Sequence, residues 1–123
     1  MQLKVSAILA AILLAGSLTA QALSKPQANH VIATLTVKEG VARDQMLKVM
    51  PGEVRATVQL YLDGKIEQWY SRGDGKGVVF ILACKTVEEA KALTDTLPLV
   101  KENFVTFEYM PIGPLNPLRL LLQ

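Results

Sequence analysis

The hydrophobic and polar positions of the chain follow two different periods. Alternation with a period of two, which is typical of half-buried strands, occurs in His30–Lys38, Lys65–Ser71 and Glu102–Met110. The segment Gly77–Cys84 is apolar throughout, and such a run is typical of a strand that is buried on both faces. We therefore expect four strands, with the third inside the sheet.

Helical spacing separates the first two strands. Proline lacks an amide donor and clashes with the preceding helical turn, so Pro51-Gly52 is expected to divide this region into two helical pieces, Ala42–Met50 and Gly52–Leu62. Asp63-Gly64 supplies a C-terminal stop. The residues that share the apolar side of the second piece are Val54, Val58, Tyr61 and Leu62.

A further helix is expected over Thr86–Thr96, before the last strand. Thr86 is a natural N-cap, and Glu89 follows it at the spacing of a capping box. Pro98 ends this helix within an apolar turn, Leu97–Val100. The element order is then βαββαβ, which predicts an α+β ferredoxin-like domain. Its antiparallel four-stranded sheet has the strand order 4-1-3-2, with both helices on one face.

The two middle strands are expected to form a hairpin, because glycines and an aspartate in Arg72–Gly77 favour a tight turn. One layer of helices leaves the other face of the sheet bare, although the strand Gly77–Cys84 is apolar on both sides. A second copy of the chain, packed sheet to sheet with two-fold symmetry, would cover that face. We therefore expect a homodimer or higher homo-oligomer.

The start of the chain has the pattern of a secretory signal peptide. Lys4 precedes the apolar run Val5–Leu18, and Ala20-Gln21-Ala22 fits a cleavage site after Ala22. The run is shorter than the roughly 20 residues of a membrane-spanning helix, so no stable membrane insertion is expected after cleavage. The protein is predicted to be secreted or periplasmic. The predicted divisions are a signal peptide (1–22), a polar leader (23–29), the ferredoxin-like domain (30–114) and an apolar C-terminal tail (115–123) at the dimer interface.

Composition and spacing argue against several classes of site. The chain has 13 basic and 11 acidic residues and no basic stripe with interleaved aromatic residues, so nucleic acid is not an expected partner. Cys84 is the only cysteine, cannot form an intrachain disulfide and is expected in the core. No His, Cys and Asp residues have metal-ligand spacing, so no metal is expected. The glycines at 73, 75 and 77 lie within a hairpin and do not form a phosphate loop.

Several short segments together resemble a known family. They are Met50–Glu53, Leu60-Tyr61, Gly64, Trp69-Tyr70, Gly77–Phe80, Val87–Ala90, Leu97–Leu99 and Pro111–Pro114. In these segments the chain resembles the dimeric α/β-barrel superfamily, in particular muconolactone isomerase and the YCII-related small proteins. The most specific feature is the last helix followed by Thr96-Leu97-Pro98-Leu99, which is similar to a helix and Leu-Pro-Leu turn of muconolactone isomerase. The resemblance spans 30–114 and implies a dimer or higher oligomer, a small, often cyclic ligand and no cofactor.

Three residues are candidates for proton transfer. His30 is the only histidine, and alternation along neighbouring antiparallel strands puts it on the same face as Glu108. A His30–Glu108 pair is suited to moving a proton next to a carbonyl group, as a lactone isomerisation requires. Glu53 is the third candidate, because an acidic residue recurs at this place in the family pattern. The alternative interpretations are an exposed strand-end histidine for His30 and a carboxylate in the first turn of a helix for Glu53.

The aromatic and basic residues near the hairpin are candidates for ligand binding. Trp69, Tyr70 and Arg72 are suited to holding a planar, anionic ligand by stacking and charge, and Tyr61 belongs to the family pattern. The alternative is that they pack against a partner subunit. Two functions therefore stay open: an exported, cofactor-independent isomerase that moves a proton on a small lactone or related carbonyl compound, or a non-catalytic small-ligand-binding or structural dimer.

Overall fold

A computed structural model describes residues 27–115, 118, 121 and 122. The chain divides into two units, and the unit Ala28–Gly113 contains the sheet and the helices that pack on it. The predicted signal peptide, its cleavage site and most of the predicted leader lie outside the described residues, as does part of the C-terminal tail. The account below concerns the unit Ala28–Gly113.

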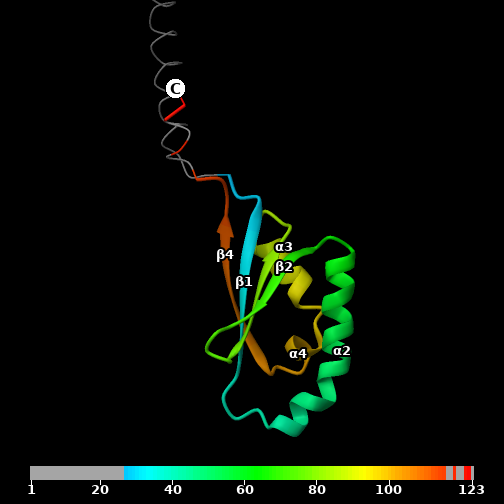
Figure 1. Cartoon of the computed structure of the whole chain (residues 1–123). Coiled ribbons are helices and arrows are strands. Elements are labelled where there is room, and N and C mark those ends of the chain that lie inside the picture. Colours follow the sequence, from blue (N-terminus) through cyan, green and yellow to red (C-terminus); the bar gives the residue numbers. More distant parts are fainter. Residues whose placement is uncertain (1–26, 116–117, 119–120, 123) are drawn as a thin grey trace, which may run out of the picture. The chain divides into compact units, whose positions relative to one another are not determined.

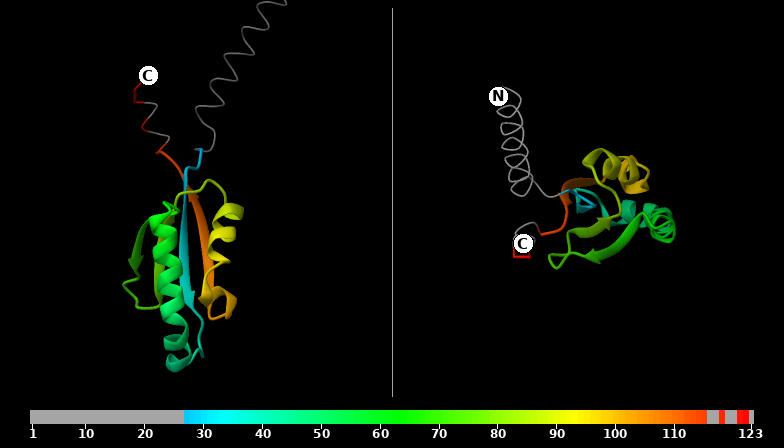
Figure 2. Two further views of the ribbon diagram at one scale, coloured as in Figure 1. Left: turned by 90° about the vertical axis from the view of Figure 1, so that its right-hand side faces the viewer. Right: turned by 90° about the horizontal axis from the view of Figure 1, so that it is seen from above.

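The folded unit has the element order that the sequence pattern predicts, with one additional short helix (Figure 1). The elements are β1 (His30–Val37), α2 (Arg43–Leu62), β2 (Ile66–Ser71), β3 (Gly77–Leu82), α3 (Val87–Thr94), α4 (Pro98–Lys101) and β4 (Val105–Ile112). The additional helix, α4, is the segment that was expected to be only an apolar turn. All three helices lie on one face of the sheet, with α2 on the side of β2 and with α3 and α4 on the side of β4 (Figure 2).

The sheet confirms the predicted topology. Its strands are antiparallel neighbours in the order β2-β3-β1-β4, which is the order 4-1-3-2 read from the other edge. The fold is therefore α+β with a ferredoxin-like arrangement. Pro111 lies in β4, an edge strand, where a missing amide donor is tolerated.

Helix α2 corrects the predicted break at Pro51. The helix runs without interruption through Pro51 and Gly52 for 20 residues. Apolar residues on both sides of the proline, including Met46, Met50 and Leu60, pack against the same core. This tertiary packing holds both halves of the helix in line and overrides the local preference for a break. Pro51 is exposed, and so is Leu47, the residue whose backbone carbonyl loses its helical partner at the proline.

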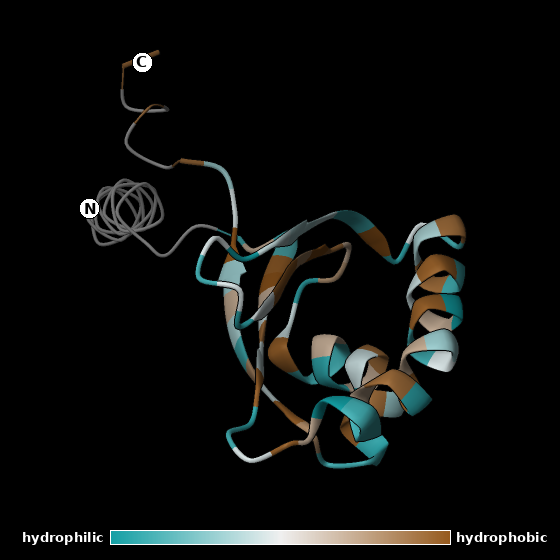
Figure 3. Cartoon of the chain, turned by 60° about the horizontal axis from the view of Figure 1, so that its bottom comes forward, coloured by the Kyte–Doolittle hydropathy of each residue, from teal (hydrophilic) through white to brown (hydrophobic). Residues whose placement is uncertain are grey.

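The side of α2 that faces the core is also not the predicted one. The four residues predicted to form its apolar side are exposed, by 39% for Val58 up to 71% for Leu62. The buried residue of the helix is Glu53. Apolar positions consequently occur along much of α2, toward the sheet and away from it (Figure 3). The side of α2 that faces the core therefore carries a buried carboxylate, a group that is costly to bury unless it is hydrogen-bonded.

The hairpin and the helix cap agree with the sequence. Strands β2 and β3 are joined by the turn at 72–76, and β2 is an exposed edge strand with a register shift between Ile66 and Gln68. The Thr86 hydroxyl accepts a hydrogen bond from the Glu89 amide at 3.1 Å, as the capping-box spacing predicts. The Glu89 carboxylate lies 3.4 Å from the amide of Lys85 rather than that of Thr86.

The core lies between the sheet and the helix layer. Alternate residues of β1 (Val31, Ala33 and Leu35) are almost fully buried and pack with Phe80 and Leu82 of β3. Cys84 is buried as expected. On the opposite face of the sheet, Ile32 and Ile81 are only partly buried in the single chain. No helix among the described residues is long and apolar enough to cross a membrane.

Candidate ligand pocket beneath helix α2

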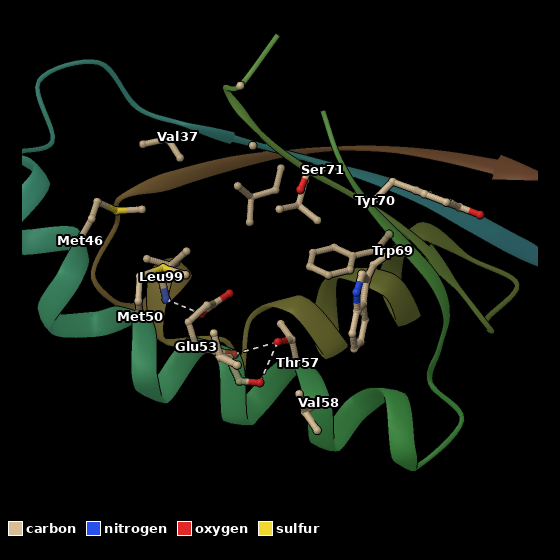
Figure 4. A pocket seen from close by; sticks show the side chains of 16 residues that line it. Val37, Met46, Met50, Glu53, Thr57, Val58, Trp69, Tyr70, Ser71 and Leu99 are labelled. Carbon is tan, nitrogen blue, oxygen red and sulfur yellow. Dashed lines mark hydrogen bonds between the residues drawn. The ribbon is translucent and has the colours of Figure 1, made fainter. Parts of the chain in front are cut away.

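A pocket of about 430 Å³ lies between helix α2 and the sheet (Figure 4). This volume is within the usual range for small-molecule sites. Its walls come from α2, from the three strands nearest to that helix, from the β2–β3 turn and from α4. The lining residues are mainly apolar, and the polar side chains among them are Glu53, Thr57, Trp69, Tyr70 and Ser71.

Glu53 is the acidic residue of this lining. Its side chain projects from α2 toward the sheet (Figure 4), and the residue is only 4% exposed. One carboxylate oxygen, Oε2, accepts a hydrogen bond of 2.9 Å from the backbone amide of Leu99. Every described side-chain oxygen or nitrogen that is fully buried has a hydrogen-bond partner. The second oxygen of Glu53 is therefore either bonded or in contact with the solvent-accessible space of the pocket.

Two elements far apart in sequence fix the position of this carboxylate. On α2, Met46, Met50, Glu53 and Thr57 follow the spacing i, i+4, i+7 and i+11, which puts them on one side of a continuous helix. On α4, which begins at Pro98, the Leu99 amide belongs to the first turn, where amides have no partner within the helix. Glu53 supplies that partner and so connects α2 to α4.

Burial raises the pKa of the Glu53 carboxyl above its ordinary value of 4.5, and the hydrogen bond from Leu99 opposes this effect only in part. Desolvation penalises the charged form, and none of the lining residues carries a compensating positive charge. A raised pKa makes the ionised carboxylate a stronger base and makes the acid a usable proton donor closer to neutral pH. Glu53 therefore has the properties of an acid–base group.

Two of the predicted ligand-binding residues, Trp69 and Tyr61, contact each other, but only Trp69 is a lining residue of the pocket. Trp69 lines it, and its indole ring points toward α2 (Figure 4). The Tyr61 ring from α2 packs against this indole with 4.9 Å between ring centroids and an interplanar angle of 58°. The two rings form a half-exposed aromatic pair, of which Trp69 is the member that lines the pocket.

Tyr70 and Arg72 do not join that aromatic pair. Tyr70 contributes to the lining, but its ring extends away from the cavity (Figure 4) and its hydroxyl donates to Gln68. The guanidinium of Arg72 binds the hydroxyl of Thr36 and the carboxylate of Asp74, and Arg72 is not a lining residue. The predicted clamp of two aromatic rings and a guanidinium is therefore not assembled at this pocket, because successive residues of β2 point to opposite faces of the sheet.

The predicted His30–Glu108 pair is not formed. Both residues lie, as predicted, on the face of the sheet that no helix covers, called the open face below. The register of β1 and β4, however, pairs His30 with Ile112 and pairs Glu108 with Thr34. Four residues of a strand span about 13 Å, which is too far for a hydrogen bond between the two side chains. The ring of His30 instead lies between Asn29 and Glu67, and its Nε2 is 2.8 Å from Oε2 of Glu67.

Sequence reasoning missed several residues of the pocket. Met46, Met50 and Thr57 share the side of α2 on which Glu53 lies, and Ser71 and Gly77 come from the hairpin. Reading α2 as one helix would have revealed an acid on an apolar side. No feature of the sequence indicated that the Leu99 amide would bind Glu53, because the partner of a backbone amide cannot be deduced from the residue type.

Comparisons with known proteins leave the family resemblance as a prediction. No protein-family model matches the chain, and no curated protein shows significant similarity to it. Within the part of the chain that the structure describes, no three His, Cys, Asp or Glu side chains are grouped in a way that would hold a metal ion. The site is therefore interpreted from its own geometry.

The raised pKa of Glu53 predicts a pH-dependent effect on stability. A folded-state pKa above 4.5 means that the folded protein binds this proton more tightly than the unfolded chain does. Stability is then lost as the pH rises from about 4.5 through the folded-state pKa. Relative to Glu53→Gln, the wild-type protein should lose free energy of unfolding over this interval, and the difference should become constant once Glu53 is ionised. Urea denaturation of both proteins from pH 4 to pH 9 measures it, and a difference that is independent of pH would contradict the assignment.

Proposed function

We propose that the protein is an exported isomerase that moves a proton on a small lactone or related carbonyl compound bound beneath α2, with Glu53 as the acid–base group. The observation that carries this proposal is a carboxyl group with a raised pKa, buried in an apolar pocket of ligand size. The reaction needs a positioned base of this kind, because a hydrogen on the carbon next to a carbonyl group is only weakly acidic.

The reaction is a migration of a carbon–carbon double bond. The ionised carboxylate of Glu53 takes a proton from the carbon next to the carbonyl, the C–H bond breaks and its electron pair is delocalised into an enolate. The resulting carboxylic acid exchanges its proton with water and returns a proton either to the first carbon, which restores the starting compound, or to the far carbon of the conjugated system, which forms a new C–H bond and shifts the double bond. The composition of the compound and the charge of Glu53 are unchanged at the end. The Ser71 hydroxyl, on the lining, is a donor for the enolate oxygen.

A second function, non-catalytic binding, is favoured by one specific contact. The hydrogen bond from Leu99 gives Glu53 a structural role in connecting α2 and α4, and this role requires no reaction. The pocket would then serve only to hold a ligand. Turnover separates the two functions, because ligand binding is common to both.

The proposal is tested by incubating the mature chain (23–123) with a panel of small β,γ-unsaturated lactones and ketones and following the conjugated product by its absorbance. The isomerase proposal predicts turnover of at least one compound of this class. Binding of these compounds without conversion would favour the binding function and refute the isomerase.

We further propose that the mature protein is a homodimer joined through the open face of the sheet. Ile32 and Ile81, which pair across β1 and β3, and Met110 of β4 make this face apolar, and Met110 is 56% exposed in the single chain. Light scattering at micromolar concentration should give twice the chain mass, and Ile81→Asp should give a monomer. Leu62→Asp, which adds the same charge to the exposed side of α2, should stay dimeric. A wild-type monomer would contradict the proposal.

A further inference from the structure

The lining of the α2 pocket contains an acidic side chain but no basic one. Glu53 is its acidic residue, and no lysine, arginine or histidine is among the lining residues, all of which belong to the described part of the chain. The remaining hydrogen-bonding side chains are neutral, and the Thr57 hydroxyl already donates to backbone carbonyls of α2. A ligand in this pocket therefore meets apolar surface, neutral donors and one carboxyl group.

The cationic residue that the sequence pattern suggested for ligand binding, Arg72, is bound to other groups. The guanidinium of Arg72 is bound by the carboxylate of Asp74, the backbone oxygen of Leu35 and the hydroxyl of Thr36. Its charge is consequently compensated within the hairpin. An ionised ligand would have to leave water without gaining an ion pair, which is costly for a charged group.

We infer that the pocket selects neutral carbonyl compounds and rejects their carboxylate counterparts. This inference rests on the proposed function for the choice of carbonyl compounds, but it concerns binding and does not require turnover. A carbonyl oxygen is an acceptor for the Ser71 hydroxyl and needs no positive partner. A carboxylate in the same place is repelled by ionised Glu53 and lacks any positive partner.

Shape restricts the ligand further. The indole of Trp69 and the ring of Phe80 lie on the walls, and Gly77 leaves part of the β3 wall without a side chain. Flat aromatic walls favour planar, unsaturated rings over branched aliphatic compounds. The ligand class is therefore a neutral, planar, unsaturated lactone, cyclic ketone or ester.

Trp69 allows binding to be measured directly, because it is the only tryptophan of the chain and it lines the pocket. The experiment titrates the mature protein at pH 7.5 with the methyl ester and with the free carboxylate of one lactone-bearing acid, and follows tryptophan emission. The ester is expected to bind at least about tenfold more tightly, which is the effect of one modest unfavourable charge interaction. Equal or tighter binding of the carboxylate, or no emission change with either compound, would overturn the inference.

A matched pair of variants tests whether missing positive charge is the reason. Val58 lines the pocket and is 39% exposed, so Val58→Lys adds an ammonium group at its rim. This variant should bind the carboxylate more tightly and should reduce the preference for the ester over the carboxylate about tenfold. Leu62→Lys adds the same charge on the same helix outside the lining and should leave both affinities unchanged. An equal gain in the two variants would attribute the effect to overall charge and overturn the inference.

The two proposals fail separately. A preference for the ester together with a complete lack of turnover on the lactone panel would refute the isomerase and leave the ligand class intact. Turnover together with tighter binding of the carboxylate would refute the ligand class and leave the isomerase intact.

Discussion

Glu53→Gln is expected to lower kcat for double-bond isomerisation by about 10²- to 10⁴-fold, the usual contribution of a general acid–base group. The amide of glutamine cannot take up and return a proton. It still presents an oxygen to the Leu99 amide, which Glu53 binds at 2.9 Å, so the connection between α2 and α4 is kept. We therefore expect a fully folded protein with little activity. Steady-state kinetics and thermal denaturation of the same preparation measure the two properties.

Two variants outside the pocket serve as controls for this result. Glu108→Gln makes the same chemical change to an exposed carboxylate on the open face, and His30→Ala removes the other group that the sequence suggested. Neither side chain lines the α2 pocket, so both variants should keep kcat within about twofold of wild type. A loss of activity in His30→Ala or Glu108→Gln, with activity retained in Glu53→Gln, would move the site to the open face.

Gly77→Ala is expected to destabilise the fold by about 3 kcal/mol, the upper range for forcing extra volume into a packed interior. A β-carbon at this position would overlap the carbonyl oxygen of Leu35 and lie 2.9 Å from its carbonyl carbon. Both atoms belong to the backbone of β1, which pairs with β3 on one side and with β4 on the other. The clash therefore cannot be relieved without opening the centre of the sheet.

Gly73→Ala is the matched control for this substitution. It lies in the same hairpin, a β-carbon there meets nothing within 4 Å, and its backbone is not in the left-handed region. Its effect should stay within about 0.5 kcal/mol of wild type. Urea denaturation of both variants measures the difference, and a Gly77→Ala protein as stable as Gly73→Ala would show that β1 and β3 are not packed as described.

The fold was predictable because the strands carry the information locally. Alternation in β1 and β4, the glycine-rich turn before Gly77 and the cap at Thr86 each correspond to one element. The relative phase of β1 and β4 was also correct, since it follows from alternation alone. Their register was not, because β4 extends through Pro111 to Ile112 and this shifts Glu108 away from His30.

The site was less predictable because it depends on tertiary contacts. A local rule for Pro51 divided α2, and this division hid the side on which Glu53 lies with Met46 and Met50. The hydrogen bond from Leu99 joins residues 46 positions apart through a backbone amide. Glu53 was thus recognised as a candidate, while the burial that raises its pKa became visible only in the folded chain.

Deuterium exchange tests the central claim most directly. A neutral β,γ-unsaturated γ-lactone is incubated in D₂O with wild-type protein or with Glu53→Gln, and proton NMR follows the hydrogens next to the carbonyl. We predict that the wild-type protein exchanges one of these hydrogens for deuterium faster than buffer does, and that Glu53→Gln exchanges it at the rate of buffer. Equal exchange by the two proteins would contradict a role for Glu53 in proton transfer.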